Sequence, residues 1–196
     1  MKITEKDIRQ MIKEELQSLK ESQNFEEWPE ELQQVFEEKW EDAVYSHRQT
    51  WEKVLYNSII ANKNSFERYI KGNSNLGTLD KYYNYQFKDP VKRIVTNITF
   101  ELFDEYEKKK MYKESDILSN IWMGAIDYYK NTEEGREITD YLYNLAKFAW
   151  MVGTNEVPDG ISEEQREYLS KIIEMAKGDP ELMVSAYGLY ETMFLD

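Results

Sequence analysis

Apolar side chains recur at steps of three and four residues through most of this chain, and this spacing constrains the fold more than any other feature. It places them on one face of an α-helix, whereas a half-buried strand needs strict alternation. The clearest run predicts one long helix near residues 29–62, because it begins at Pro29 and meets no Gly. The positions on its inner face are Leu32, Val35, Phe36, Trp40, Ala43, Val44, His47, Trp51, Val54, Leu55 and Ile59.

Further helices are predicted by residues that can cap a first turn. A Ser, Thr or Asp side chain accepts hydrogen bonds from first-turn amides, and proline suits the first helical position. Gly72, Gly153 and Gly178 are expected to end helices. Together these signals predict an all-α, irregular bundle of about seven to nine helices, with residues 25–196 as a single domain. The predicted starts are Asp89-Pro90, Ser115 or Asp116, Thr132, Ser162 with Gln165, and Asp179-Pro180.

The first residues carry a self-contained helix signal. Thr4 can cap this helix, and Ile3 with Ile8 has the spacing of a hydrophobic staple. The stretch after Leu19 is polar, so residues 1–21, here called the leader, are expected to form an amphipathic appendage. Its apolar stripe needs a protein partner, which makes the stripe the predicted partner-binding site. The leader stripe consists of Ile8, Ile12, Leu16 and Leu19, with Lys2, Lys6, Arg9 and Lys13 around it.

Charge and composition exclude several classes of function. The chain has 38 acidic and 25 basic side chains, and its formal net charge is −13. Nucleic-acid binders normally carry a basic footprint, so direct binding of DNA or RNA is not expected. The acidity serves either solubility or mimicry of nucleic acid toward a basic protein. The chain has no Cys, which excludes a disulfide scaffold, a thiolate metal site and a cysteine nucleophile.

No sequence feature predicts a membrane protein or a secreted one. Apolar runs are only a few residues long, whereas a membrane-spanning helix needs about 20. The N-terminal residues alternate charged with apolar side chains and lack the continuous apolar core of a secretory signal. The sequence therefore predicts a soluble, cytoplasmic protein, and it leaves the oligomeric state open.

Few residues offer catalytic chemistry. His47 is the single histidine, and its place on an apolar helix face favours a half-buried side chain bonded to a neighbour. No phosphate-binding Gly-Lys-Ser/Thr loop and no Gly-x-Ser-x-Gly motif occurs, so a P-loop nucleotide site and a serine hydrolase elbow are not expected. The sequence predicts no cofactor.

Two groups of carboxylates have the spacing of helical metal ligands. One is Glu37-Glu38-x-x-Glu41 on the long helix, and the other is Glu101-x-x-Asp104 on the helix after Pro90. Carboxylates three or four positions apart share a helix face, and two such faces could hold Mg²⁺. This pairing resembles the all-α nucleotide pyrophosphohydrolases of the MazG type. The resemblance implies a Mg²⁺ site at Glu38, Glu41, Glu101 and Asp104, whereas a solvated helix face implies none.

The segment Lys2-Ile-Thr-Glu-Lys-Asp-Ile-Arg-Gln-Met-Ile-Lys-Glu-Glu-Leu16 resembles a short helical leader found on many proteins of tailed bacteriophages. The resemblance implies a phage or phage-like origin, in the host cytoplasm or the virion, and a leader that docks onto an assembling particle or stays on its own domain. The leading hypothesis is a non-enzymatic protein–protein interaction protein, either a virion or assembly component or a binder of a host factor. The alternatives are the Mg²⁺-dependent hydrolase and an acidic inhibitor that mimics nucleic acid.

Overall fold

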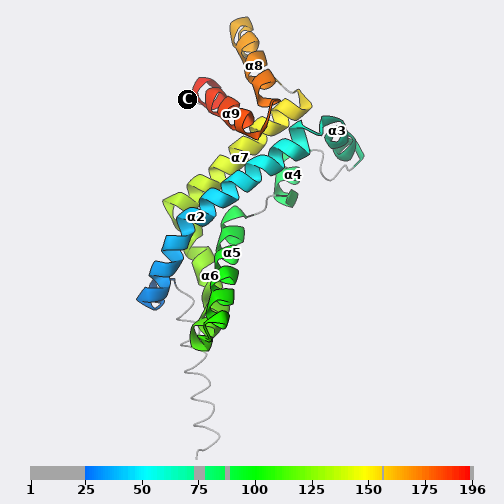
Figure 1. The fold of residues 1–196 in the computed structure, drawn as a ribbon. Coiled ribbons are helices and arrows are strands. Elements are labelled where there is room, and N and C mark those ends of the chain that lie inside the picture. Colours follow the sequence, from blue (N-terminus) through cyan, green and yellow to red (C-terminus); the bar gives the residue numbers. More distant parts are fainter. Residues whose placement is uncertain (1–24, 73–77, 87–88, 156, 195–196) are drawn as a thin grey trace, which may run out of the picture. The chain divides into compact units, whose positions relative to one another are not determined.

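The computed structural model is built from helices (Figure 1). It describes residues 25–72, 78–86, 89–155 and 157–194. Within these ranges the chain forms eight α-helices, a short 3-10 helix η1 (Phe25–Glu27) and a π-helical turn η2 (Tyr56–Ile60), without a strand, so the all-α prediction is confirmed. The α-helices are α2 (Glu30–Leu55), α3 (Lys63–Gly72), α4 (Leu79–Gln86), α5 (Pro90–Lys108), α6 (Tyr112–Asn131), α7 (Glu133–Thr154), α8 (Glu163–Ala176) and α9 (Pro180–Phe194).

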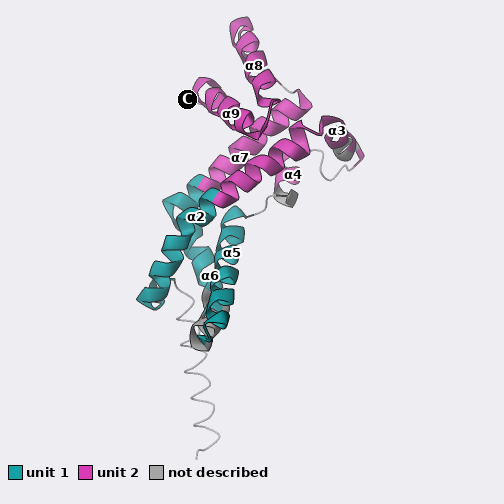
Figure 2. Ribbon diagram, in the orientation of Figure 1, with its two compact units in different colours: residues 1–45, 89–137 teal, residues 46–88, 138–196 magenta. Residues whose placement is uncertain are grey.

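The chain divides into two compact units, coloured separately in Figure 2. Unit 1 comprises residues 1–45 and 89–137, and unit 2 comprises residues 46–88 and 138–196. Each unit takes part of α2 and part of α7. The single domain predicted over residues 25–196 stays a prediction, and so does the separate leader, whose residues lie outside the described part of the chain.

The long helix predicted near residues 29–62 corresponds to α2, which continues into the π turn η2. The large side chains of its predicted inner face are buried: Phe36 and Leu55 are fully enclosed, and Trp40 and Trp51 are nearly so. Val54, also predicted on this face, is instead 41% exposed, because it lies about 100° around the helix from buried Leu55. Burying a large apolar side chain contributes about 1.5–3 kcal/mol. Packing of this apolar face therefore stabilises α2 more than the intrinsic helix propensity of its residues does.

The core of unit 1 lies where α5 and α6 pack together. The inner face of α5 includes Val91, Ile94, Val95, Ile98 and Leu102, all buried. Two of them are valines, which favour strands, yet the spacing keeps them in a helix. As predicted, this helix begins at Pro90 and is capped by Asp89, whose Oδ1 accepts a hydrogen bond of 3.1 Å from the Lys92 amide.

An aromatic cluster closes the other side of unit 1. The Trp40 and Tyr129 rings stack with centroids 3.9 Å apart, and the Phe25 ring lies 4.5 Å from that of Tyr128. Phe36 completes the cluster at 5.6 Å from Tyr129. These contacts hold η1 and the start of α2 on α6.

In unit 2 the aromatic side chains also form the core. The Phe66 ring meets the Trp150 ring edge-on, at 5.3 Å and 90°, and lies 5.4 Å from the Tyr82 ring. Helix α8 begins at the predicted capping box, because the Ser162 hydroxyl accepts from the Gln165 amide while the Gln165 side chain accepts from the Ser162 amide. The ring contacts show that Phe66, Tyr82 and Trp150 serve packing.

Two helix boundaries differ from the prediction. Helix α6 begins at Tyr112, before Ser115 or Asp116, because Lys110 adopts a left-handed conformation (φ 60°) and reverses the chain directly after α5. Gly153 does not end α7, which runs to Thr154. A Cβ at position 153 would lie 2.5 Å from Ile59 Cγ2, so glycine is needed there for close helix approach. None of the described helices has both the length and the apolar character required to cross a membrane.

Candidate functional site

The predicted partner-binding stripe falls outside the described residues. Ile8, Ile12, Leu16 and Leu19 all precede Phe25, where the description of the chain begins. Within the described residues, the candidates are the carboxylates of α2 and α5 and an apolar groove on α5.

The four carboxylates of the Mg²⁺ hypothesis lie on two helices of unit 1. Glu38 and Glu41 are on α2, Glu101 and Asp104 are on α5, and all four are exposed. Glu38 accepts a hydrogen bond of 3.1 Å from Gln34 Nε2 on its own helix. Each helix thus carries two of the four carboxylates, as the sequence spacing predicts.

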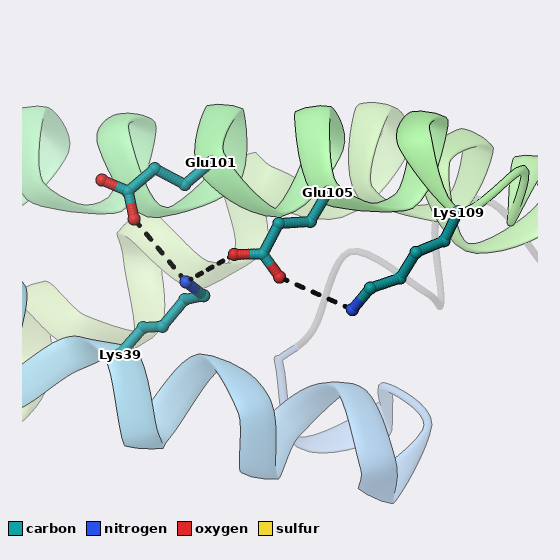
Figure 3. Close-up of polar contacts among 4 residues, drawn as sticks. All are labelled: Lys39, Glu101, Glu105 and Lys109. Atoms are coloured by element: carbon teal, nitrogen blue, oxygen red, sulfur yellow. Dashed lines mark hydrogen bonds and ion pairs between the residues drawn. The ribbon is translucent and has the colours of Figure 1, made fainter.

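A lysine lies between the two helices at this level (Figure 3). The Lys39 Nζ is 3.0 Å from Glu105 Oε1 and 3.7 Å from Glu101 Oε2. The second oxygen of Glu105 is 3.9 Å from Lys109 Nζ. The hydrogen bond and charge of Lys39 lower the pKa of Glu105, and the same bond raises the pKa of Lys39. Lys39 of α2 is thus already paired with two of the acidic side chains of α5.

The carboxylates do not converge on a metal site. Within the described ranges, no group of three or more His, Asp or Glu side chains is arranged to hold a metal ion. Glu38, Glu41, Glu101 and Asp104 therefore belong to no such group. The hydrolase hypothesis retains only the sequence spacing on which it was based.

His47 has the structural role that its sequence position predicts. Its side chain is half-buried, and its Nε2 accepts a hydrogen bond from Trp51 Nε1 one turn further along α2. The two rings meet edge-on with centroids 5.3 Å apart. The prediction of a histidine bonded to a neighbour is confirmed.

Sequence reasoning missed a polar cluster in unit 2. The Tyr141 hydroxyl donates to Glu52 Oε1 at 2.6 Å, and the same oxygen lies 3.0 Å from Arg48 Nε. The Arg48 guanidinium carbon lies 3.8 Å from the centre of the Tyr141 ring, a cation–π geometry. Burial, together with the nearby Glu52 carboxylate, raises the pKa of Tyr141. The Arg48–Glu52 spacing is visible in the sequence, but nothing there points to Tyr141.

The surface of α5 carries an apolar groove that the sequence did not indicate. The Phe100 groove, about 350 Å³ in volume, is lined by Thr96, Thr99, Phe100 and Phe103 of α5 and by Trp122 of α6. Phe100 is 67% exposed, more than any other large apolar side chain in the described part of the chain. The one buried hydroxyl, that of Thr99, donates to the Val95 carbonyl at 2.8 Å. The groove thus offers an apolar lining without a charged side chain.

Comparisons with known proteins identify no relative. No protein-family model matches the chain, and no match was found among curated proteins or solved structures.

Proposed function

We propose that this chain is a non-enzymatic protein–protein interaction protein whose Phe100 groove receives an apolar, helical segment of a protein partner. The observation that carries the proposal is Phe100, which is 67% exposed beside an apolar groove. Burying such a side chain is worth about 1.5–3 kcal/mol, which a partner can recover on binding. An amphipathic helix laid into an apolar groove is a recurrent mode of recognition.

The polar clusters support a binding role over a catalytic one. The Lys39 ammonium is shared by Glu101 and Glu105, and Glu52 is held by both Arg48 and Tyr141. In each cluster, charged side chains of the chain itself form ion pairs with one another. Both clusters are therefore best explained as contacts that hold neighbouring helices together.

Two further features define the kind of partner. The leader resembles those of tailed-phage proteins, which supports a virion or assembly component, or a binder of a host factor, as the biological role. The net charge of −13 repels nucleic acid and acts mainly on the rate of encounter with a protein. The groove itself supplies an uncharged contact, so affinity should depend only weakly on salt.

Site-specific photo-crosslinking tests the proposal. A photoreactive phenylalanine analogue is placed at position 100, and the matched control carries it at position 45, because Tyr45 is an aromatic side chain of similar exposure, 64%. In the native host, position 100 should yield a protein adduct that position 45 does not. Equal labelling at both positions would contradict the proposal.

The partner identified in this way then permits a quantitative test. Phe100→Glu should weaken its binding by at least about tenfold, equivalent to 1.4 kcal/mol, and Tyr45→Glu should leave it unchanged. Moderate salt should have little effect. A partner that is indifferent to Phe100→Glu and lost at moderate salt would instead favour the acidic inhibitor.

A further inference from the structure

We propose that unit 2 carries a binding site for a small zwitterion with an aromatic ring, of which an aromatic α-amino acid is the simplest member. The site, here called the α7 pocket, has a volume of about 560 Å³, and its lining residues belong to unit 2, whereas the Phe100 groove belongs to unit 1. The inference therefore goes beyond the proposed function and does not depend on it. The lining includes Asn144, Lys147, Phe148 and Met151 of α7, Asp159 after it, and Tyr190 of α9.

One face of α7 forms the floor of the α7 pocket. Four of its side chains follow the spacing i, i+3, i+4, i+7, which places them on one side of a helix: Asn144, Lys147, Phe148 and Met151. Phe148 is fully buried and Met151 nearly so, which makes part of this face apolar. Asn144 is half-buried and Lys147 is exposed. The same face therefore also offers an amide and an ammonium.

Contacts between helices hold the walls of the pocket in place. On the α9 side, the Tyr190 ring packs against the Phe148 ring with centroids 5.4 Å apart and a tilt of 41°. On the α4 side, the Tyr143 hydroxyl donates to Asp80 Oδ1 at 2.7 Å and joins α7 to the first turn of α4. The pocket is therefore preformed, and its volume lies within the range of about 300–1,000 Å³ that is usual for small-molecule sites.

The polar side chains of the pocket are not used by the fold. The Lys147 Nζ lies 5.4 Å from the centre of the Tyr143 ring, and in the described part of the chain it has no ion pair. Among the described residues Asp159 likewise has no ion pair, and neither the Asn144 side-chain amide nor the Tyr190 hydroxyl has a hydrogen bond. A ligand can therefore engage these four groups without breaking an ion pair or hydrogen bond of the described residues.

The charges of the lining select the ligand. Among the described lining residues, Lys147 is the one basic side chain and Asp159 is the one acidic side chain. Lys147 attracts a carboxylate and Asp159 attracts an ammonium, whereas a ligand with only one of these charges is repelled by the like charge. A phosphate dianion is further disfavoured by the net charge of −13. A zwitterion satisfies both side chains.

The aromatic side chains of the pocket specify the rest of the ligand. Phe148, Trp150 and Tyr190 all line it, and pairs of aromatic rings gain more than their buried area alone provides. The Met151 sulfur adds a favourable contact for a ring. An aromatic α-amino acid combines such a ring with both charges in one small molecule, so it matches every part of the lining.

Methyl NMR of the full-length chain, labelled with ¹³C-methyl methionine, tests the site with L-tryptophan as the probe. The Met151 signal should shift in a saturable manner, because a bound ring changes the magnetic field at the floor of the pocket. Met123 on α6 is the control: it is 44% exposed, against 7% for Met151, so undirected stacking would affect it first. A Met151→Leu variant identifies the Met151 signal.

Analogues of the probe and two variants test the two charges separately. Tryptamine lacks the carboxylate and indole-3-propionate lacks the ammonium, and each should bind at least about tenfold more weakly than L-tryptophan. Lys147→Gln should weaken L-tryptophan by a similar factor without weakening tryptamine. Asp159→Asn should weaken L-tryptophan without weakening indole-3-propionate. Lys171→Gln is the matched control, because Lys171 is an exposed lysine of α8 paired with Glu167, and this variant should bind L-tryptophan like the natural chain.

A saturable Met151 shift that depends on both charges supports the inference. No such shift with L-tryptophan, L-tyrosine or L-phenylalanine up to about 10 mM, where even a millimolar Kd is visible, would overturn it. Equal shifts at Met151 and Met123, or equal binding of tryptamine or indole-3-propionate, would overturn it as well. Circular dichroism of each variant confirms that it is folded. Capture of a partner at position 100 is measured separately, so the proposed function keeps its own test.

Discussion

Gly135 lies so close to the Tyr129 backbone that a Cβ at position 135 would be 1.7 Å from the Tyr129 carbonyl oxygen. This contact sits at the turn from α6 to α7, where the Thr132 hydroxyl accepts a hydrogen bond from the Gly135 amide. Gly135→Ala should therefore destabilise the protein by about 1–3 kcal/mol, the usual cost of overpacking. Urea denaturation measures this change.

The matched control for that substitution is Gly188→Ala in α9. No atom lies within 4 Å of a Cβ built at Gly188, and alanine in a helix interior is favoured over glycine by about 0.8–1 kcal/mol. The control should therefore raise stability. If both variants lose stability alike, the close approach at Tyr129 is not the cause.

The ion pair between Lys39 and Glu105 predicts a pH-dependent contribution to stability. The pKa of Glu105 is lowered in the folded chain by Lys39, so the contribution is present above the pKa of an unfolded glutamate. It is lost as pH falls through the lowered value. Because Glu105 is nearly half exposed, Lys39→Gln should cost at most about 1 kcal/mol at neutral pH.

Urea denaturation across the acidic range measures that loss. The difference between Lys39→Gln and the natural chain should disappear once Glu105 is protonated. Lys92→Gln, on the exposed surface of α5, serves as the control and should give a difference with little dependence on pH in this range. A Lys39→Gln effect that persists at acidic pH would indicate packing of the lysine stem instead.

Buried tyrosines predict a loss of stability at alkaline pH. Burial raises the pKa of Tyr83 from 10.0 to about 12, and it also raises those of Tyr129 and Tyr187. A raised pKa contributes stability that is complete below the unfolded value of 10.0 and is lost as pH rises through the folded one. Each such group can lower the free energy of unfolding by up to about 1.4 kcal/mol per pH unit. Tyr83→Phe should make the decline between about pH 10 and pH 12 shallower, as measured by urea denaturation.

Nucleotide hydrolysis tests the alternative function. The purified chain should release no pyrophosphate from a panel of nucleoside triphosphates with Mg²⁺ or Mn²⁺, because Glu101 is paired with Lys39 and the carboxylates do not converge. Glu41→Ala should behave like the natural chain. Metal-dependent turnover that Glu41→Ala abolishes would restore the hydrolase hypothesis and overturn the non-enzymatic one.

The fold was predictable where local signals decide it. Asp89 and Ser162 cap their helices as their sequence neighbours indicate, and the three-four spacing located α2. The start of α6 was not predictable, because it depends on a left-handed lysine at position 110 that no local propensity favours. The role of Gly153 was not predictable, because glycine is needed there for close approach to Ile59, which lies far away in the sequence.

The candidate site was much harder to predict from the sequence than the fold. Phe100 lies off the buried face of α5, and a single apolar residue on the outer face of a helix normally needs no explanation. It becomes significant only because Trp122 of α6 joins it in one groove. Likewise, the spacing of the two carboxylate groups allowed either a metal site or a solvated helix face, and it gave no sign that Lys39 pairs with Glu101 and Glu105.

The π turn at residues 56–60 has a consequence for how this chain can change length. A π turn takes up more residues than an α-helical turn, and this one delivers Ile59 against Gly153. Because its hydrogen bond spans five residues, the turn can lose one residue, such as exposed Asn57, and close to α-helical spacing with Ile59 still facing Gly153. A residue lost from α2 before this turn would instead rotate Ile59 by about 100° relative to the preceding helix and break that contact.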